Sequence, residues 1–121
     1  NTGEAVTPNQ IADMSWDMDR LMTVGEEVYG KACAACHQPN GQGIPGAFPG
    51  LVGTDIVMGD IGAHIDIVVN GKAGTAMQAF KDQLSPEEIA AVVTYERNAW
   101  GNNVGDSVKP STVASWNGGE K

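Results

Sequence analysis

One short stretch, "KACAACHQPNG" at residues 31–41, constrains this chain more than any other. It holds both cysteines, Cys33 and Cys36, and His37, one of the two histidines. The C-x-x-C-H spacing has four chemical interpretations: a redox dithiol, a structural disulfide, a zinc site, or the covalent attachment of a haem. Each interpretation makes a different demand on the rest of the sequence.

The first three interpretations fit the remaining sequence poorly. A thioredoxin-like dithiol is expected beside a β-α-β pattern, and none is visible. A disulfide between Cys33 and Cys36 would close too small a loop to stabilise the fold much. A zinc finger needs the H-x₃₋₅-H spacing, but His37 adjoins Cys36 and His64 lies far along the chain.

The haem interpretation uses all three residues. C-x-x-C-H is the signature of c-type haem attachment, in which two thiols bind the vinyl groups and the adjacent histidine lies below the iron. The composition agrees, because 16 glycines, two phenylalanines and two tyrosines leave few large side chains to fill a core. A haem would supply that apolar volume. We therefore predict one covalent haem c on Cys33 and Cys36, with His37 as an iron ligand.

The ring of His37 needs a partner of its own. We expect its Nε2 to bind the iron while Nδ1–H donates to a backbone carbonyl, which fixes the orientation of the ring. The Gly- and Pro-rich loop "QPNGQGIPGAFPGLVG" follows directly. Within it, the carbonyl of Pro49 is favoured over that of Pro45.

The second axial ligand is expected to be Met77. It lies far enough beyond His37 for the chain to return on the other haem face, and its neighbours in "GKAGTAMQAF" are small, so the backbone can approach the porphyrin closely. His64, Met58 and an open position are the alternatives. His64 is otherwise expected to be a histidine with its hydrogen bonds satisfied. The methionines that precede the attachment site are expected to pack in the core: Met14, Met18 and Met22.

The hydrophobic periodicity predicts three main helices and no strand pair, hence an all-α domain. The first helix covers residues 16–32, with Ser15 as its N-cap. The second covers 59–69. The third runs toward Trp100 from a capping box at its start: Ser85, Pro86 and Glu88. We expect a domain at residues 16–100 between a linker-like segment, 1–15, and a tail of turn formers, 101–121.

Charge and hydropathy exclude several classes of protein. The net charge is −8 with a pI near 4.4, which argues against a nucleic-acid partner. No run approaches the roughly 20 apolar residues of a membrane span, and no signal peptide is present. We therefore expect either a mature secreted protein or a soluble piece of a larger one.

Residues 16–100 resemble a class I cytochrome c. The segments "CAACHQPNGQGIPGAFPGL", "HIDIVVNGKAGTAMQAF" and "AAVVTYERNAWGN" are most similar to the cytochrome c domain fused to subunit II of bacterial caa-type haem-copper oxidases. The resemblance implies a class I cytochrome c fold of about three main helices around one covalent haem c. It also implies thioether bonds at Cys33 and Cys36, ligands His37 and Met77, and packing of Gly25 and Tyr29 against Val92 and Tyr95.

The resemblance further implies a function without catalysis of its own. Such domains take single electrons from an upstream cytochrome or quinol-oxidising complex, on the periplasmic side of the bacterial inner membrane. They pass them to a dinuclear copper centre in the cupredoxin domain of the same subunit. That centre needs two more cysteines, so the chain would be an excised fragment.

A free periplasmic shuttle cytochrome, and a haem enzyme or gas sensor with an open sixth position, are the alternatives. One departure is Gln78, where family members often have proline near the methionine.

Overall fold

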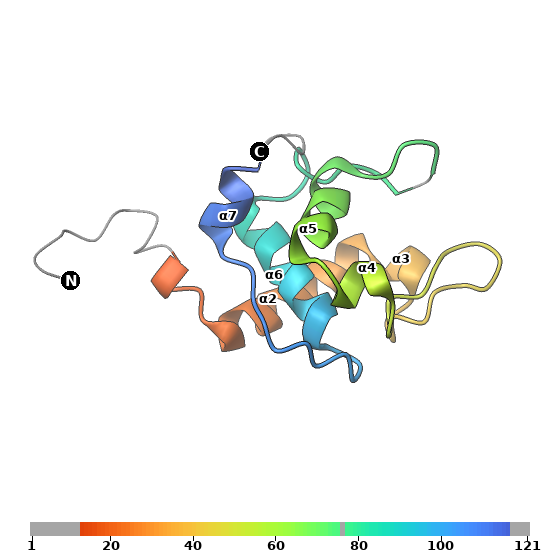
Figure 1. Cartoon of the computed structure of the whole chain (residues 1–121), viewed down its shortest axis with the longest axis horizontal. Helices are drawn as coiled ribbons and strands as arrows, with labels where there is room; N and C mark the ends of the chain where they lie inside the picture. Colours follow the sequence, from red (N-terminus) through yellow and green to blue (C-terminus); the bar gives the residue numbers. More distant parts are fainter. Residues whose placement is uncertain (1–12, 76, 117–121) are drawn as a thin grey trace, which may run out of the picture.

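The computed structural model describes residues 13–75 and 77–116. These ranges contain helices and a single isolated β-bridge, Ile44–Phe48, but no strand, which confirms the predicted all-α class. No helix among them is long and apolar enough to cross a membrane. The helices, drawn in Figure 1, are α2 (Met18–Ala32), α3 (Ala34–His37), α4 (Asp55–Met58), α5 (Ile61–Asn70), α6 (Pro86–Asn98) and α7 (Pro110–Ala114).

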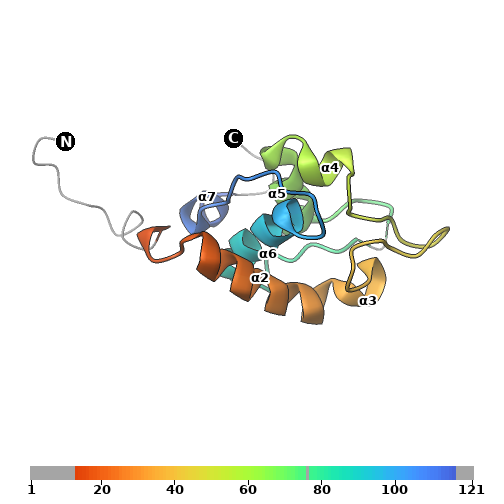
Figure 2. The same cartoon turned by 90° about the horizontal axis from the view of Figure 1, so that it is seen from below.

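The pairing of α2 with α6 is the main helix–helix contact, and the two helices lie side by side in Figures 1 and 2. They meet at Gly25, where an added Cβ would overlap the carbonyl oxygen of Ala91 and lie 2.6 Å from Cβ of Tyr95. The aromatic ring of Tyr29, one turn further on, lies 5.7 Å from that of Tyr95. The packing implied by the resemblance is thus present, and it requires a residue without a side chain at the crossing.

The hydrophobic core lies between α2, α5 and α6. Its largest share comes from α6, whose residues from Ile89 to Val93 are all buried. Each residue removed from water there stabilises the fold through its buried apolar area. Apart from α6, the buried hydrophobic residues of the core are Leu21, Val28, Tyr29, Leu51, Val57, Ile65, Val68, Val69, Phe80, Val108 and Val113.

The start of α2 differs from the prediction. Asp17, rather than Ser15, caps the helix: its side chain accepts a hydrogen bond of 2.9 Å from the backbone N–H of Arg20. A carboxylate is a charged acceptor and also complements the positive end of the helix dipole. Trp16 therefore lies before the helix, with its ring 3.9 Å below the Arg20 guanidinium.

The second predicted helix is shifted by two residues at its start. Gly59 has non-helical backbone angles, and Asp60 is the N-cap of α5, accepting from the N–H of Ala63 at 3.0 Å. The prediction also missed α4, a single turn that includes Met58. Four residues are too few to show a helical periodicity in the sequence.

The third predicted helix is confirmed at its start. Ser85 accepts from the N–H of Glu88, the Glu88 side chain accepts from the N–H of Ser85, and Pro86 occupies the first turn of α6. The helix ends at Asn98, short of the expected Trp100, because Ala99 is already extended.

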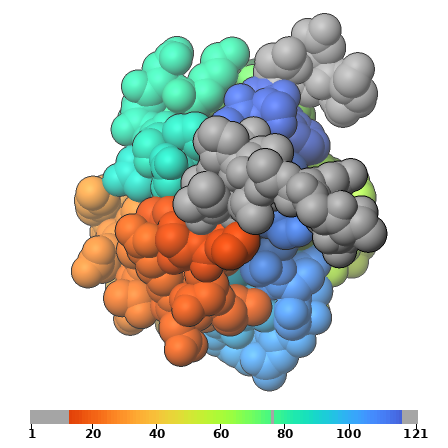
Figure 3. All heavy atoms as spheres, turned by 90° about the vertical axis from the view of Figure 1, so that its left-hand side faces the viewer, coloured from red at the N-terminus to blue at the C-terminus, as the bar shows by residue number. Residues whose placement is uncertain are grey.

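The segment after α6 contains a helix that the prediction missed. The helix α7 begins with Pro110, which is common at the first position of a helix, and it packs on α6. The Ser111 hydroxyl donates to Asp13 at 2.6 Å, and the indole N–H of Trp116 donates to Asp66 at 3.0 Å. Figure 3 shows the start of α2 and this C-terminal segment on one face of the molecule.

The α2–α6 crossing generates a prediction with a matched control. Gly25→Ala should lower the free energy of unfolding by about 1–3 kcal/mol or more, since the added methyl group overpacks the crossing. Gly30→Ala in the same helix meets nothing within 4 Å and should raise it by about 0.5–1 kcal/mol, the usual gain of Ala over Gly. Chemical denaturation of both variants measures the difference. Equal stabilities would contradict the close approach of α6 to Gly25.

Candidate functional site

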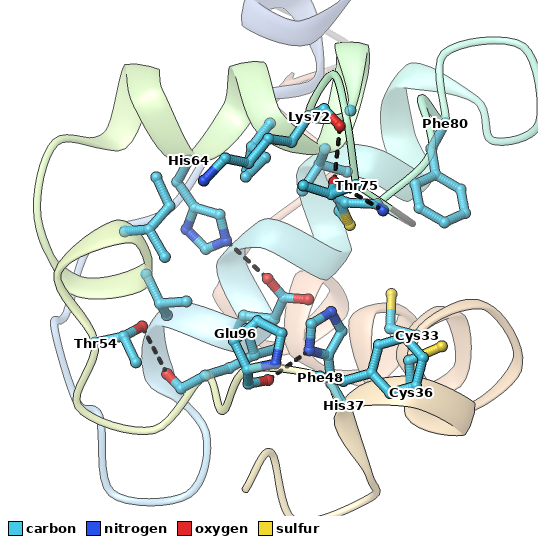
Figure 4. A pocket seen from close by; sticks show the side chains of 18 of the residues that line it. Cys33, Cys36, His37, Phe48, Thr54, His64, Lys72, Thr75, Phe80 and Glu96 are labelled. Carbon is cyan, nitrogen blue, oxygen red and sulfur yellow. Dashed lines mark hydrogen bonds and ion pairs between the residues drawn. The ribbon is translucent and has the colours of Figure 1, made fainter. Parts of the chain in front are cut away.

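One large cavity, with a volume of about 920 Å³, lies between the end of α2, α3, α4, α5 and the loop that follows α5. Figure 4 shows it from close by. Both cysteines, both histidines and Met77 line this cavity. The tertiary structure therefore brings together every residue that the sequence analysis assigned to the site.

The two cysteines lie where α2 gives way to α3. Cys33 is the C-cap of α2, and the backbone N–H of His37 donates to its carbonyl at 3.0 Å, so the C-x-x-C-H stretch forms one tight turn. Both thiols are free and half-buried. Burial, the charge of Glu96 and the neighbouring Cys36 raise the pKa of the Cys33 thiol to about 12. Among the described residues, no group of three or more Cys, His, Asp or Glu side chains is placed to hold a metal ion.

His37 is oriented by a backbone carbonyl. Its Nδ1 lies 2.9 Å from the oxygen of Pro49, the residue favoured over Pro45 in the sequence analysis. Since a carbonyl only accepts, Nδ1 carries the proton and donates. The lone pair of His37 is therefore on Nε2, where it is available to a metal ion.

The Gly-rich loop after α3 folds back so that Pro49 reaches His37. The N–H of Gly43 donates to the His37 carbonyl at 2.9 Å, and Ile44 and Phe48 exchange backbone hydrogen bonds across the turn. At Gly43 the φ angle is +73°, and a Cβ would lie 2.5 Å from the Phe48 carbonyl oxygen. Only glycine combines this positive φ angle with so close an approach of the Phe48 carbonyl.

Met77 comes from the loop after α5, on a different part of the cavity wall. In Figure 4, Thr75 of this loop lies across the cavity from His37. The N–H of Met77 donates to the Thr75 hydroxyl at 3.2 Å, and its carbonyl accepts from the N–H of Lys72 at 3.0 Å. These bonds fix the backbone on both sides of the methionine.

The other methionines lie elsewhere. Met58 is 38% exposed and does not line the cavity. Met14 and Met18 were expected in the core, but they are 72% and 37% exposed. That expectation is wrong for these two residues, because α2 begins only after Asp17: Met14 precedes the helix and Met18 is its first residue. Met22, one turn further on, is half-buried.

His64 forms a buried pair that the sequence analysis missed. Its Nε2 lies 2.7 Å from Oε1 of Glu96 on α6, and the two residues are 1% and 5% exposed. Nδ1 of His64 is buried without a hydrogen-bond partner. The expectation of a satisfied histidine therefore holds for one ring nitrogen only. No sequence signal linked Glu96 to the site, because the two residues are far apart in the chain.

The geometry fits a large, flat, mostly apolar group that holds a metal ion. Two thiols lie at one side of the cavity, and an imidazole and a thioether approach it from separate segments. Aliphatic and aromatic side chains, such as Val57, Val68 and Phe80, cover much of the remaining wall. These are the donors and the surroundings of a covalently bound haem.

Comparison with known proteins gives the family. Residues 20–95 match the family described as cytochrome c oxidase, cbb3-type, subunit III. The chain is 38% identical over 91 residues to cytochrome c-552 of Thermus thermophilus, an alignment covering 64% of this chain and 69% of that protein. It is 35% identical over 99 residues to the cytochrome c subunit of a quinone-dependent alcohol dehydrogenase of Gluconobacter oxydans. That match covers 74% of this chain but only 21% of the subunit.

A solved structure shares the fold. The dihydro-heme d1 dehydrogenase NirN, in complex with DHE, aligns with a TM-score of 0.56 and 28% identity, over 63% of this chain and 16% of that one. The matched family and the C-x-x-C stretch together imply a covalent haem c on Cys33 and Cys36. The chain belongs to the class I cytochromes c, in the family of the cbb3-type oxidase subunit III, and is a monohaem electron-transfer domain with the all-helical cytochrome c fold.

Proposed function

We propose that His37 and Met77 are the axial ligands of the haem iron. The support is the Nδ1–Pro49 hydrogen bond, which leaves Nε2 of His37 available, and the position of Met77 on the cavity wall. Of the alternatives, Met58 is outside the cavity lining and Nε2 of His64 is engaged with Glu96. A haem with His and Met ligands exchanges one electron at a raised reduction potential.

The hydrogen bonds around Met77 support that role. The Thr75 and Lys72 hydrogen bonds hold the Met77 backbone against the cavity, so a methionine ligand there would close the sixth position to small molecules. Much of the cavity wall is apolar. A low-dielectric surrounding also reduces the reorganisation that accompanies a change of charge. The alternative of a haem enzyme or gas sensor would require this sixth position to open.

The partner we propose is the dinuclear copper centre in the cupredoxin domain of a caa-type oxidase subunit II, with this chain as the cytochrome c domain of the same subunit. The support is the resemblance of "TYERNAWGN", residues 94–102, to that group. An upstream cytochrome or a quinol-oxidising complex would supply the electrons, on the periplasmic side of the inner membrane.

A free periplasmic shuttle cytochrome is the second candidate. The alignment with the Thermus cytochrome c-552 favours it, since that alignment covers 69% of the relative. The two candidates share the haem site and differ in whether the domain is tethered to its electron acceptor.

The first prediction concerns the sixth ligand. The reduced native protein should not bind carbon monoxide, and its oxidised form should show the weak long-wavelength sulfur–iron band. Met77→Ala should lose this band and bind carbon monoxide, whereas Met58→Ala, outside the cavity, should behave like the native protein. If Met77→Ala leaves the spectrum and the reduction potential unchanged, Met77 is not the ligand.

The second prediction concerns the backbone that presents Met77. A Cβ on Gly71 would lie 2.7 Å from the Met77 carbonyl oxygen, whereas one on Gly74 would meet nothing within 4 Å. Both glycines have positive φ angles, +73° and +78°, so alanine strains the backbone at both positions. Gly71→Ala should therefore weaken the sulfur–iron band while Gly74→Ala retains it. Equal loss in both variants would assign the effect to backbone strain alone.

The third prediction concerns the partner. We expect the electron to leave near the "GQGIPGAF" and Met77 loops, away from the exposed acids of α2 and its N-cap: Asp17, Asp19, Glu26 and Glu27. In stopped-flow mixing, the reduced protein should reduce an isolated caa-type copper domain faster than an unrelated cupredoxin, with a modest salt dependence. Equal rates would favour the free shuttle. A steep salt dependence, abolished by neutralising those four acids, would contradict the docking face.

A further inference from the structure

Glu96 is an unusual residue for the wall of a haem cavity. It is 5% exposed and lines the cavity together with His64. Among the residues that the structure describes, no other Asp or Glu is buried to this degree. Taking a carboxylate out of water is costly unless it is paired, so its presence calls for an explanation.

The protonation state of the pair follows from its hydrogen bonds. If His64 were an imidazolium, or if Glu96 were protonated and donated to Nε2, then Nδ1 of His64 would carry a buried proton with no acceptor. Buried N–H groups without an acceptor are rare and costly. A protonated Glu96 that accepted from Nε2–H would need an acceptor for its own O–H, and among the described residues its side chain has no hydrogen-bond partner other than His64. The arrangement that fits is therefore a neutral imidazole that donates from Nε2 to an ionised Glu96, with an unprotonated Nδ1, and its 2.7 Å length is typical of a charge-assisted hydrogen bond. The pair then has a net charge of −1.

Nearby cations do not cancel this charge. The guanidinium of Arg97, the next residue, is bound to the Asp106 carboxylate by two hydrogen bonds of 2.8 Å and also donates to the carbonyls of Val57 and Gly59. Lys72, the one lysine among the cavity-lining residues described, is exposed to solvent. The charge of Glu96 also reaches the attachment site, since it contributes, after burial, to the raised pKa of Cys33.

We propose that Glu96, held in place by His64, is a fixed buried negative charge that lowers the reduction potential of the haem. A negative charge stabilises the oxidised iron more than the reduced iron, because the oxidised form is more positive. Burial keeps the interaction from being screened by salt. His64 is the positioning residue that holds this charge, and the role of Glu96 requires the haem but neither the proposed axial methionine nor the proposed partner.

The test is the midpoint potential of the intact haem protein. Glu96→Gln keeps the shape and the acceptor for His64 but removes the charge, so it should raise the potential, and the rise should persist at high ionic strength. Glu27→Gln removes the same charge from the exposed face of α2; its smaller shift should fade as salt is added. An unchanged potential in Glu96→Gln, with a native spectrum and fold, would overturn the proposal.

A second variant checks the net charge of the pair. His64→Gln replaces a neutral donor by another neutral donor, so the potential should stay close to that of the native protein. A marked fall would mean that His64 is an imidazolium and the pair is neutral, which would overturn the proposal.

A direct measurement needs no variant at all. Nitrogen-15 NMR of the reduced native protein should show His64 protonated at Nε2 only. Just one other histidine, His37, is present in the chain, so the two rings can be assigned. Protons on both nitrogens of His64, or on Nδ1 alone, would contradict the charged pair.

Discussion

The contact of α2 with α6 at Gly25 is the interaction on which the remaining structure depends. Cys33 is the C-cap of α2 and Glu96 lies near the end of α6, so the crossing determines where the attachment site lies relative to the buried acid. A side chain at Gly25 would overlap Ala91 and Tyr95 and separate the helices. The aromatic cluster beyond the crossing, in which Tyr29 and Trp100 have ring centroids 5.0 Å apart, extends the same contact toward α3.

The segment 94–102 then positions much of the cavity wall. Asn102 donates to the carbonyls of Leu51 and Glu96 and accepts from the N–H of Gly53. Arg97 binds two carbonyls around α4, and the Trp100 indole donates to the Pro39 carbonyl. The hydrogen bonds of Asn102 to Leu51 and of Arg97 to Val57 are buried, and they satisfy loop carbonyls that would otherwise be costly to remove from water. Most polar side chains of this segment therefore anchor neighbouring loops, whereas that of Glu96 lines the cavity.

Local sequence was enough to predict the elements with strong local signals. The capping box of Ser85 and Glu88 and the three main helices were predicted, because their causes lie within one or two turns of chain. The short helices α4 and α7 were missed, since one turn of helix is marginal without tertiary contacts. The cap of α2 was misplaced because Ser15 and Asp17 are both good N-caps, and only the structure, in which Trp16 contacts Arg20 outside the helix, distinguishes them.

By itself the sequence determined the chemistry: C-x-x-C-H admits few cofactors, and the scarcity of large apolar side chains leaves room for a haem. Tertiary structure decided which further side chains and carbonyls line the cavity and contact its histidines. The approach of Pro49 to His37, the presence of Met77 in the cavity lining and the pairing of His64 with Glu96 all join residues far apart in sequence. No local pattern encodes such contacts, because they arise when helices and loops are packed together and their buried polar atoms find partners.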